Sequence, residues 1–563
     1  MRNLTASLMA IITCSLVVSL SSNAYASLYE TKHFPFSLIE NDDINSSIRN
    51  IFERYKVSNY DTISSIDEQE KNILSPNEEI VHDIQRNGKK KYYLRAAIET
   101  SVIFGFVSAF YWGTTHSSDD FDFDISFDTL KKKLSGKYVL FEDNKIRTNS
   151  FPGHPLSGSY YYLIARNNNL SRTESFLWSF AASIINELFI EFTEVASLND
   201  MVITPVAGAT IGEAMYEFGK YFRCAKNRDD FIYKILAAFI DPVALGHSFI
   251  WRDVPYKYSK DDVCSYTPIQ KDISISNGVS VTYHENTNDF SIGPLFGVHG
   301  KLYFIPQYGQ KADIDRFFKE PILSEIGIDF GVTDKGVDNI HFLAKTVWSA
   351  YYRQNITRDP AGEATGYSFF VGLASAFEHI QYDTGEFEDW IGALHVFGPS
   401  MELTSFHSAG YVRIGLDVFG DFAMVRSYVF DKYKKNHSID NIKSVLMKEN
   451  YYYAYGVYIN PKFEIRYGSH RFLAQYKYAH YDSFEGRDRR NPSNDFHLVD
   501  KQQGYGFVVG QLLNFFDAPF FKNHELWIEA EARRIARSGF IADGKVSHNG
   551  GDTWLVLRFR VML

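Results

Sequence analysis

The sequence has little of what marks a metal-thiolate protein, a helical membrane protein or a nucleic-acid-binding protein. Only three of the 563 residues are cysteine, and no CxxC spacing occurs, which argues against a thiolate metal site. Beyond residue 26 the longest apolar run, Ser101 to Gly113, falls short of the about 20 residues that a membrane-spanning helix needs. The formal net charge of −10 argues against nucleic acid as a partner.

The usual catalytic and nucleotide-binding motifs are also missing. The sequence contains no GxSxG elbow, no HExxH, no phosphate-binding loop and no GxGxxG. His247 stands beside Ser248, but neighbouring side chains do not face each other in regular structure, so the pair does not predict a nucleophile. The sequence therefore predicts no cofactor and leaves open whether the protein is an enzyme.

The N-terminus has the order of a cleavable secretion signal. Arg2 precedes an apolar run from Leu4 to Leu20, and the small residues of Ala24-Tyr25-Ala26 follow, so cleavage is expected after Ala26. An uncleaved anchor is the alternative, although the run is short and interrupted by Thr and Ser. A lipid-attachment site at Cys14 is a further alternative, disfavoured because Thr13 precedes it. Export would place Cys224 and Cys264 in an oxidising compartment, where they could pair.

Composition divides the rest of the chain. Residues 27–95 are rich in Ser, Asn, Asp, Glu and Lys, and they are expected to form a polar, poorly ordered periplasmic arm. Residues 96–265 are expected to be partly helical, and residues 266–563 to form a β-barrel. Aromatic residues reach 16% of the chain, and Tyr and Phe suit strands and membrane interfaces.

The central segment contains three expected helices and one acidic stretch. From Arg95 to Trp112 the pattern fits a helix, and Asp119 to Phe127 alternates as a strand would; a calcium loop is the alternative there, although its glycine and closing glutamate are missing. Ser171 or Thr173 could cap a long helix reaching Ala196, with Glu174 near its start. Pro205 is expected in the first turn of the next helix, whose glycines, Gly208, Gly212 and Gly219, would let another backbone approach.

Beyond about residue 270 the apolar residues recur with period two. Val412, Ile414 and Leu416 share one face of YVRIGLDVF, while Arg413 and Asp417 share the other. The same alternation continues in segments such as KFEIRY from Lys462 and EAEAR from Glu529. The runs 364–381, 391–405, 409–424 and 451–467 are about twice as long as sandwich strands, which favours a transmembrane barrel.

The C-terminal segment resembles the last strand of an outer-membrane barrel. In WLVLRFRVML the residues Leu557, Phe559, Val561 and Leu563 share one face, and Arg558 and Arg560 the other. Turns rich in Gly, Asp, Asn and Pro are expected to separate the strands, including Asn549-Gly550-Gly551. About twelve antiparallel strands are predicted, an even number as is usual for such barrels.

The segment from Tyr138 to Phe222 contains three distinctive motifs: FEDN at Phe141, TNSFPGHPLSGSYYYLIAR at Thr148 and ASLNDMVITPVAGATIGE at Ala196. In these motifs the segment resembles a bacterial family known only as a domain of unknown function, number 3943. The resemblance covers about a sixth of the chain and implies an outer-membrane-type protein, and it implies no activity.

Five residues near this segment form the candidate catalytic site: His154, Glu187, Glu191, Glu194 and Asp200. On one continuous helix the three glutamates would share a narrow arc, where they repel unless cations, metal or protonation intervene. They could form a metal or acid–base site with His154, or pair with barrel cations, namely Arg413, Lys477, Arg533, Arg558 and Arg560. Asn199 and Asp200 could equally be capping residues, and Glu213 and Glu217 could join the cluster or face solvent.

The leading functional hypothesis is an outer-membrane barrel with a structural or envelope-related role. Its helical segment would plug the lumen, because an acidic helix face would complement cationic strand residues. A lipid-modifying or hydrolytic enzyme using the His/Glu cluster is the alternative, and a passive pore for small solutes is the third. Expected partners are outer-membrane lipid and the barrel assembly machinery, and the ligand is unknown. The basic loops at 431–443 and 485–495 could contact lipopolysaccharide phosphates.

Overall fold

The computed structural model describes residues 90–114, 126–135, 139–140, 153–191, 196–225, 228–251, 270–333, 336–360, 362–383, 387–437, 450–484, 497–513, 524–541 and 546–563. The expected signal peptide and most of the expected arm lie outside these residues, as do Glu194, Cys264 and most of the acidic alternating stretch.

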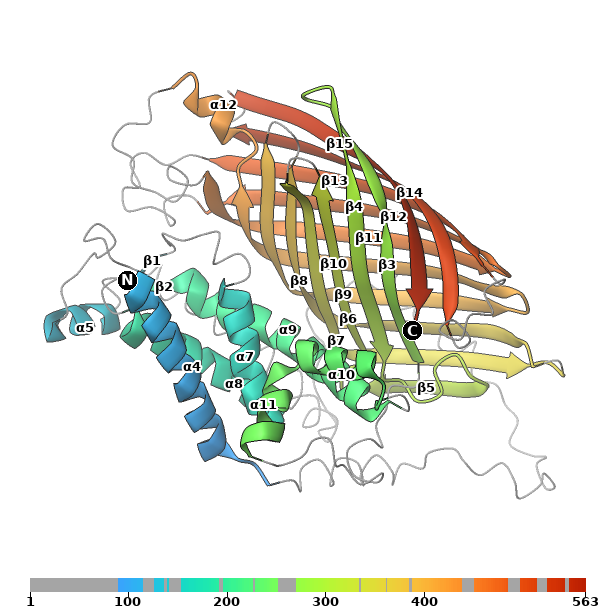
Figure 1. Ribbon diagram of the computed structural model, residues 1–563, viewed down its shortest axis with the longest axis horizontal. Helices are drawn as coiled ribbons and strands as arrows, with labels where there is room; N and C mark the ends of the chain where they lie inside the picture. Colours follow the sequence, from blue (N-terminus) through green and yellow to red (C-terminus); the bar gives the residue numbers. More distant parts are fainter. Residues whose placement is uncertain are drawn as a thin grey trace, which may run out of the picture. The chain divides into compact units, whose positions relative to one another are not determined.

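The first part of the described chain is helical (Figure 1). Its elements are α4 (Tyr93–Thr114), α5 (Phe127–Leu134), α7 (Gly153–Asn167), α8 (Arg172–Ile185), the π-helical turn η2 (Asn186–Ile190), α9 (Leu198–Cys224), α10 (Phe231–Ile240) and α11 (Pro242–Ile250), with a short parallel pair of strands, β1 (Val139–Leu140) and β2 (Ala196–Ser197). Among the described helices none is by itself long and apolar enough to span a membrane, and the bent pair α10–α11 meets that test by length and composition.

The second part is a closed antiparallel barrel (Figure 1). Its strands are β3 (Gln270–His284), β4 (Asp289–Tyr303), β6 (Leu323–Thr333), β7 (Gly336–Arg358), β8 (Ala364–Asp383), β9 (Glu388–His407), β10 (Gly410–Arg426), β11 (Tyr451–Tyr467), β12 (His470–Ser483), β13 (Leu498–Leu512), β14 (Glu525–Ile541) and β15 (Val546–Met562). Strand β15 pairs with β3, and β7 pairs with β8, which closes a ring of twelve strands. The prediction of an antiparallel barrel of about twelve strands is confirmed.

One more strand, β5 (Ala312–Phe318), continues the line of β6 along β7. Phe318 pairs with Ala350 and Leu323 with Val347, so the interruption around Pro321 shifts the register by two residues. Proline has no N–H for the ladder, which accounts for a break at this point. Glu320, which lies in the break, meets the helical segment as described below.

Both ends of the barrel have short and long connections between strands. At one end Ser408-Ala409 joins β9 to β10 and Gly468-Ser469 joins β11 to β12, and Gly468 adopts a positive φ of 55° that suits glycine. The longer connections 304–322 and 513–524 lie at this same end, whereas the other end has 427–450 and 484–497 as well as the two-residue connection 334–335. Asn549-Gly550-Gly551, expected as a turn, instead lies within β15, where Gly550 pairs with Arg537. A side chain at Gly550 would collide with the Tyr428 hydroxyl, so glycine serves close approach there.

The alternation expected from the sequence separates an outer apolar face from an inner ionic face. Leu557 is 55% exposed and Ile414 is 50% exposed on the outer face. Arg413 and Arg558, on the inner face, are buried and form ion pairs with Glu464 and Glu531, respectively. The two-faced strand pattern therefore has the arrangement predicted from the sequence.

Side chains of the strands fill the barrel interior. Lys345 on β7 reaches Asp417 on β10 at 2.5 Å, and Tyr303 donates a hydrogen bond to Glu402 at 3.1 Å. Both Asp417 and Tyr303 point into the barrel, where an open channel would expose them to water, yet Asp417 is only 6% exposed and Tyr303 only 1% exposed. Water therefore has little access to the barrel interior at this level, which is packed rather than open.

Helix α9 packs on the outer face of the barrel. In β7 His341 and Lys345 point inward, so Phe342 and Ala344 point outward by strand alternation. Both of these outward residues are buried in one apolar cluster with the α9 residues Ile203, Ala207 and Ile211. A plug formed by this helix is therefore wrong, because α9 covers the barrel wall from the outside.

Polar contacts and further packing extend this docking along α9. The Thr210 hydroxyl lies 2.7 Å from that of Ser375 on β8. Further along, Phe218 lies against Gly300 on β4 and belongs to a cluster with Ile273 and Leu302. The helix thus crosses the outer wall from β8 and β9 towards β3 and β4.

Candidate functional site

Three of the five residues predicted as a site come together. His154 is the second residue of α7, Glu187 lies in η2, and Asp200 lies in the first turn of α9. One ligand atom from each lies within 4.8 Å of the others. Glu187 and Asp200 are each 2% exposed, so the convergence is internal to the helical segment.

The remaining predicted residues lie elsewhere. Glu191 accepts a hydrogen bond from Asn186 Nδ2 at 3.0 Å and does not belong to the three-residue group, and Glu194 lies outside the described residues. The long helix expected to reach Ala196 is also wrong. Helix α8 ends at Ile185 and passes into a π-helical turn that ends at Ile190, which removes the shared arc of glutamates.

The start of α8 follows the expected capping chemistry. The Ser171 side chain accepts from the Glu174 backbone N–H, and the Glu174 carboxylate accepts from the Ser171 N–H at 2.8 Å. Pro205, by contrast, is not in the first turn of its helix, because α9 already begins at Leu198. Asp200 is therefore a first-turn helical residue, which is where a carboxylate is favoured by the helix dipole.

Several neighbours that the sequence analysis missed hold the three site residues. The Thr204 hydroxyl lies 3.2 Å from His154 Nδ1, and His154 Nε2 lies 3.7 Å from Asp200 Oδ1. The Ser197 N–H donates to Glu187 Oε2 at 2.9 Å, and the Lys133 ammonium donates to the backbone carbonyl of Glu187 at 3.2 Å. Desolvation by burial lowers the pKa of His154 to about 4, so its imidazole is neutral at neutral pH.

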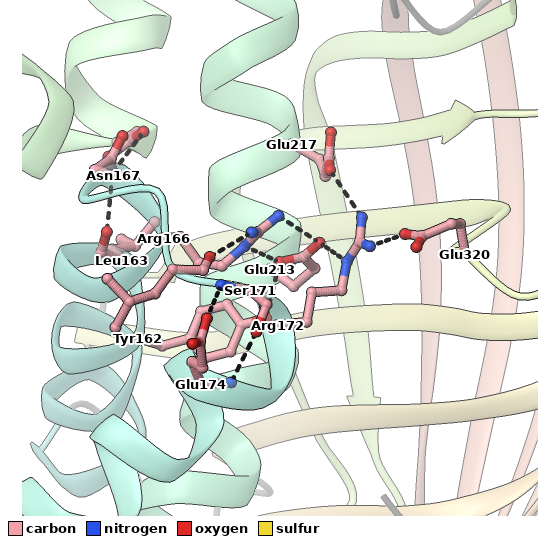
Figure 2. A network of polar contacts seen from close by, with 12 residues as sticks. Tyr162, Leu163, Arg166, Asn167, Ser171, Arg172, Glu174, Glu213, Glu217 and Glu320 are labelled. Atoms are coloured by element: carbon pink, nitrogen blue, oxygen red, sulfur yellow. Dashed lines mark hydrogen bonds and ion pairs between the residues drawn. The ribbon is translucent and has the colours of Figure 1, made fainter. Parts of the chain in front are cut away.

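A second buried network surrounds Glu213, as Figure 2 shows. Its carboxylate accepts hydrogen bonds from the Tyr162 hydroxyl at 2.9 Å, from Arg166 Nε at 2.9 Å and from Arg172 Nε at 2.5 Å. Burial alone would raise the pKa of Glu213, but the two guanidinium groups outweigh it and hold that pKa well below its usual value. Glu213 therefore belongs to an ion-pair network and does not join the His154 group.

The Glu213 network also connects the helices to the barrel. Arg172 approaches Glu217 at 3.6 Å and forms an ion pair with Glu320, which lies between β5 and β6 (Figure 2). The sequence carried no signal for this contact, because Arg172 and Glu320 come from separate parts of the chain. The break in the strand at Pro321 is what places Glu320 there.

The alternative pairing of the helical glutamates with barrel cations is not seen among the ion pairs of the described residues. The cations named from the sequence have partners on the strands or stack on strand aromatics: Arg413 with Glu402 and Glu464, Lys477 with Glu378, Arg558 with Glu529 and Glu531, Arg560 with Glu529, and Arg533 over Trp554. In the part of the chain that the structure describes, these cations are therefore matched by acidic or aromatic residues of the strands.

Two smaller predictions can also be followed. His247 Nε2 lies 2.8 Å from Glu99 and Ser248 donates to the Leu245 carbonyl, so the two do not form a nucleophilic pair, as expected. Cys224 is disulfide-bonded. Because Cys264 lies outside the described residues, its pairing with Cys224 stays a prediction.

The fold defines an outer-membrane-type β-barrel that carries a helical segment on its outer wall. Residues 139–243, which include α7, α8 and α9, match the model of the family described as "Domain of unknown function (DUF3943)". The resemblance seen in the sequence is thereby confirmed, and it assigns no activity. No curated protein matches the chain.

Solved structures with similarity to this chain are outer-membrane barrels. A loop-deletion mutant of OmpT, an outer membrane protein of Vibrio cholerae, shares 11% identity over 52% of this chain and 99% of its own, with a TM-score of 0.16. OccK2 (OpdF) of Pseudomonas aeruginosa shares 8% over 52% and 98%, with a TM-score of 0.16. The outer membrane protease OmpT from Escherichia coli shares 11% over 53% and 98%, with a TM-score of 0.14. At these identities and TM-scores the comparisons say nothing about activity.

Proposed function

We propose that the protein is a closed outer-membrane barrel that conducts no ions and holds its helical segment against the outer wall. The carrying observation is the burial of ion-paired residues inside the barrel, such as Lys345 with Asp417. An open aqueous pore would leave such side chains hydrated. The proposal retains the structural role inferred from the sequence, but the strand side chains rather than a helical plug close the lumen.

The composition of the outer wall supports the position of the helices. Elsewhere the outward residues are large and apolar, for example Phe559, which is 50% exposed. Where α9 docks, the outward residues are buried, and small or polar ones lie among larger apolar ones such as Phe342. The small or polar ones, Ser324, Ala344, Thr346 and Ser375, are each at most 1% exposed. Such residues suit close helix approach better than lipid contact, so this part of the wall is adapted to the helix.

Location in the outer membrane follows from the same proposal. The expected signal peptide would export the chain, and the two-faced C-terminal strand would be recognised by the barrel assembly machinery. Lipid would then cover the exposed apolar outer wall.

Planar-bilayer recording tests the closed lumen. Wild-type protein is expected to give no steady conductance above the lipid baseline. A control variant with interior side chains truncated, Tyr303→Ala together with Arg413→Ala, should open a measurable pathway and show that the preparation inserts. A steady wild-type conductance would instead identify a pore and overturn the proposal.

Cysteine cross-linking tests the outer-wall position. Thr210→Cys with Ser375→Cys should form a disulfide, because the hydroxyls of the two native residues are 2.7 Å apart. The matched control joins Thr210→Cys to Ser400→Cys, since Ser400 points inward and donates to Asp417. A disulfide in the control pair and none in the first pair, identified by mass spectrometry of the linked peptides, would restore the plug and reject the docking.

A further inference from the structure

We propose that His154, Glu187 and Asp200 together bind one divalent transition-metal cation of the zinc type. The three residues come from α7, η2 and α9, which are far apart in the chain, and their ligand atoms lie within 4.8 Å of one another. This is the one such group found among the described residues. It lies in the segment that matches the family of unknown function.

The spacing of the donor atoms suits a small cation. Two ligands of tetrahedral zinc, each about 2.1 Å from the ion, are about 3.4 Å apart. The distance from His154 Nε2 to Asp200 Oδ1 is 3.7 Å, so the pair needs only a small rotation to reach this value. Glu187 is the third donor, within the same 4.8 Å span.

Neighbouring groups orient the donors as they do in metal sites. The Thr204 hydroxyl at 3.2 Å occupies His154 Nδ1, which leaves Nε2 directed at Asp200. An outer partner of this kind commonly fixes the ring of a metal-binding histidine. The Ser197 N–H holds Glu187 Oε2 at 2.9 Å, and the Ser183 hydroxyl donates to the Asp200 carbonyl at 3.1 Å.

The local backbone gives independent support. Glu187 belongs to η2, a π-helical turn, and such turns are rare and occur frequently at functional sites. On a continuous α-helix Glu187 would share a face with Glu191, whereas in the structure Glu191 bonds to Asn186. The two carboxylates therefore have different neighbours: Glu191 bonds to Asn186, and Glu187 lies with His154 and Asp200.

The donor set decides between classes of cation. Calcium takes six to eight oxygen ligands, and magnesium keeps an octahedral shell made mostly of water. Two carboxylates and one imidazole match a borderline cation such as Zn²⁺, for which three protein ligands leave a position open to water or substrate. The site is thus of the open type rather than the closed structural type.

Metal content measures the proposal directly. Tag-free full-length protein in detergent is stripped with a chelator and titrated with Zn²⁺, with bound metal counted by mass spectrometry. Wild type should bind one zinc ion more per chain than His154→Gln, Glu187→Gln and Asp200→Asn. Glu191→Gln and Glu217→Gln change carboxylates outside the group and should keep the wild-type stoichiometry. Equal zinc content in wild type and the three site variants would overturn the proposal.

Amide hydrogen exchange gives a second readout that does not depend on stoichiometry. At a Zn²⁺ concentration a hundredfold above its dissociation constant, opening of the bound site should become about a hundredfold rarer. Peptides from α7, η2 and the start of α9 should therefore exchange more slowly with zinc in wild type, and not in Asp200→Asn. Metal-free exchange of the site variants shows whether they fold. Slower exchange with Ca²⁺ but not with Zn²⁺ would reject the zinc class.

Discussion

Replacing Glu213 by glutamine should loosen the helical segment, because Glu213 is a buried carboxylate on α9 that pairs with two arginines. The change leaves Arg166 and Arg172 without the buried carboxylate that accepts from both, and removing one partner of a buried ion pair costs about 3 to 5 kcal/mol. Glutamine still accepts a hydrogen bond, and Arg172 retains Glu217 and Glu320, so the lower value applies. We expect about 3 kcal/mol.

Amide hydrogen exchange followed by mass spectrometry measures the loss of stability of the helical segment separately from any change in the stability of the barrel. A loss of about 3 kcal/mol makes the openings of α7, α8 and α9 more than a hundredfold more frequent, since about 1.4 kcal/mol corresponds to a factor of ten. Glu217→Gln is the matched control, because Glu217 lies one turn further along α9 and is also buried, but approaches Arg172 only at 3.6 Å. Arg172 keeps Glu213 and Glu320 in this variant, so the cost should be clearly smaller than that of Glu213→Gln. Equal effects of the two substitutions would refute the reasoning.

Three further predictions concern pH, helix packing and the lipid face. The pKa of Glu213 is lower in the folded protein than its unfolded value of about 4.5, so the stabilisation by this carboxylate is complete above pH 4.5 and is lost as the pH falls further. The urea concentration at the midpoint of the helical circular-dichroism transition should therefore decrease when the pH is lowered below about 4.5. The decrease should be larger in wild type than in Glu213→Gln. Gly208→Ala should destabilise α7 against α9 by about 1 to 3 kcal/mol, because the new Cβ meets the Gly158 backbone, whereas Gly246→Ala, which meets nothing within 4 Å, should be neutral or slightly stabilising in the same assay. Leu557→Lys should cost about 2 to 4 kcal/mol in lipid if its 55% exposed side chain lies near the bilayer centre, and unchanged folding yields in vesicles would argue against a lipid-facing β15.

The barrel could be predicted because its signal is local. Alternation in β10, β14 and β15 separates residues by face within each strand, and the structure keeps that separation. Partners inside the lumen are a different matter. Arg413 lies directly opposite Glu464 in the register of β10 and β11, but Lys345 meets Asp417 across the interior from a strand that is not its neighbour. Such pairs require the closed barrel and cannot be found strand by strand.

The site was predicted in part for the same reason. His154 could be named from an expected turn, Glu187 from the face of an expected helix and Asp200 from the end of that helix. What the sequence concealed was the π-helical turn, which interrupts an apolar helical pattern without any glycine or proline within Asn186–Ile190. The contact of α7 with α9 is encoded more openly, because Gly208 was expected to admit a backbone and the structure places Gly158 against it.

The position of the helices follows from how charge is distributed over the whole chain. Complementarity could draw an acidic helix into the lumen only if the inward cations lacked partners, and Glu464, Glu529 and Glu531 already supply acids on the strands. The outer wall differs, because under α9 it carries the buried hydroxyl residues Thr346 and Ser375, whereas other outward positions carry exposed apolar residues such as Phe559. Lipid would solvate the Ser375 hydroxyl poorly, whereas α9 provides Thr210 as its hydrogen-bond partner. Outward strand positions are therefore mostly apolar where they face lipid, and the polar outward positions Thr346 and Ser375 lie where the helices dock.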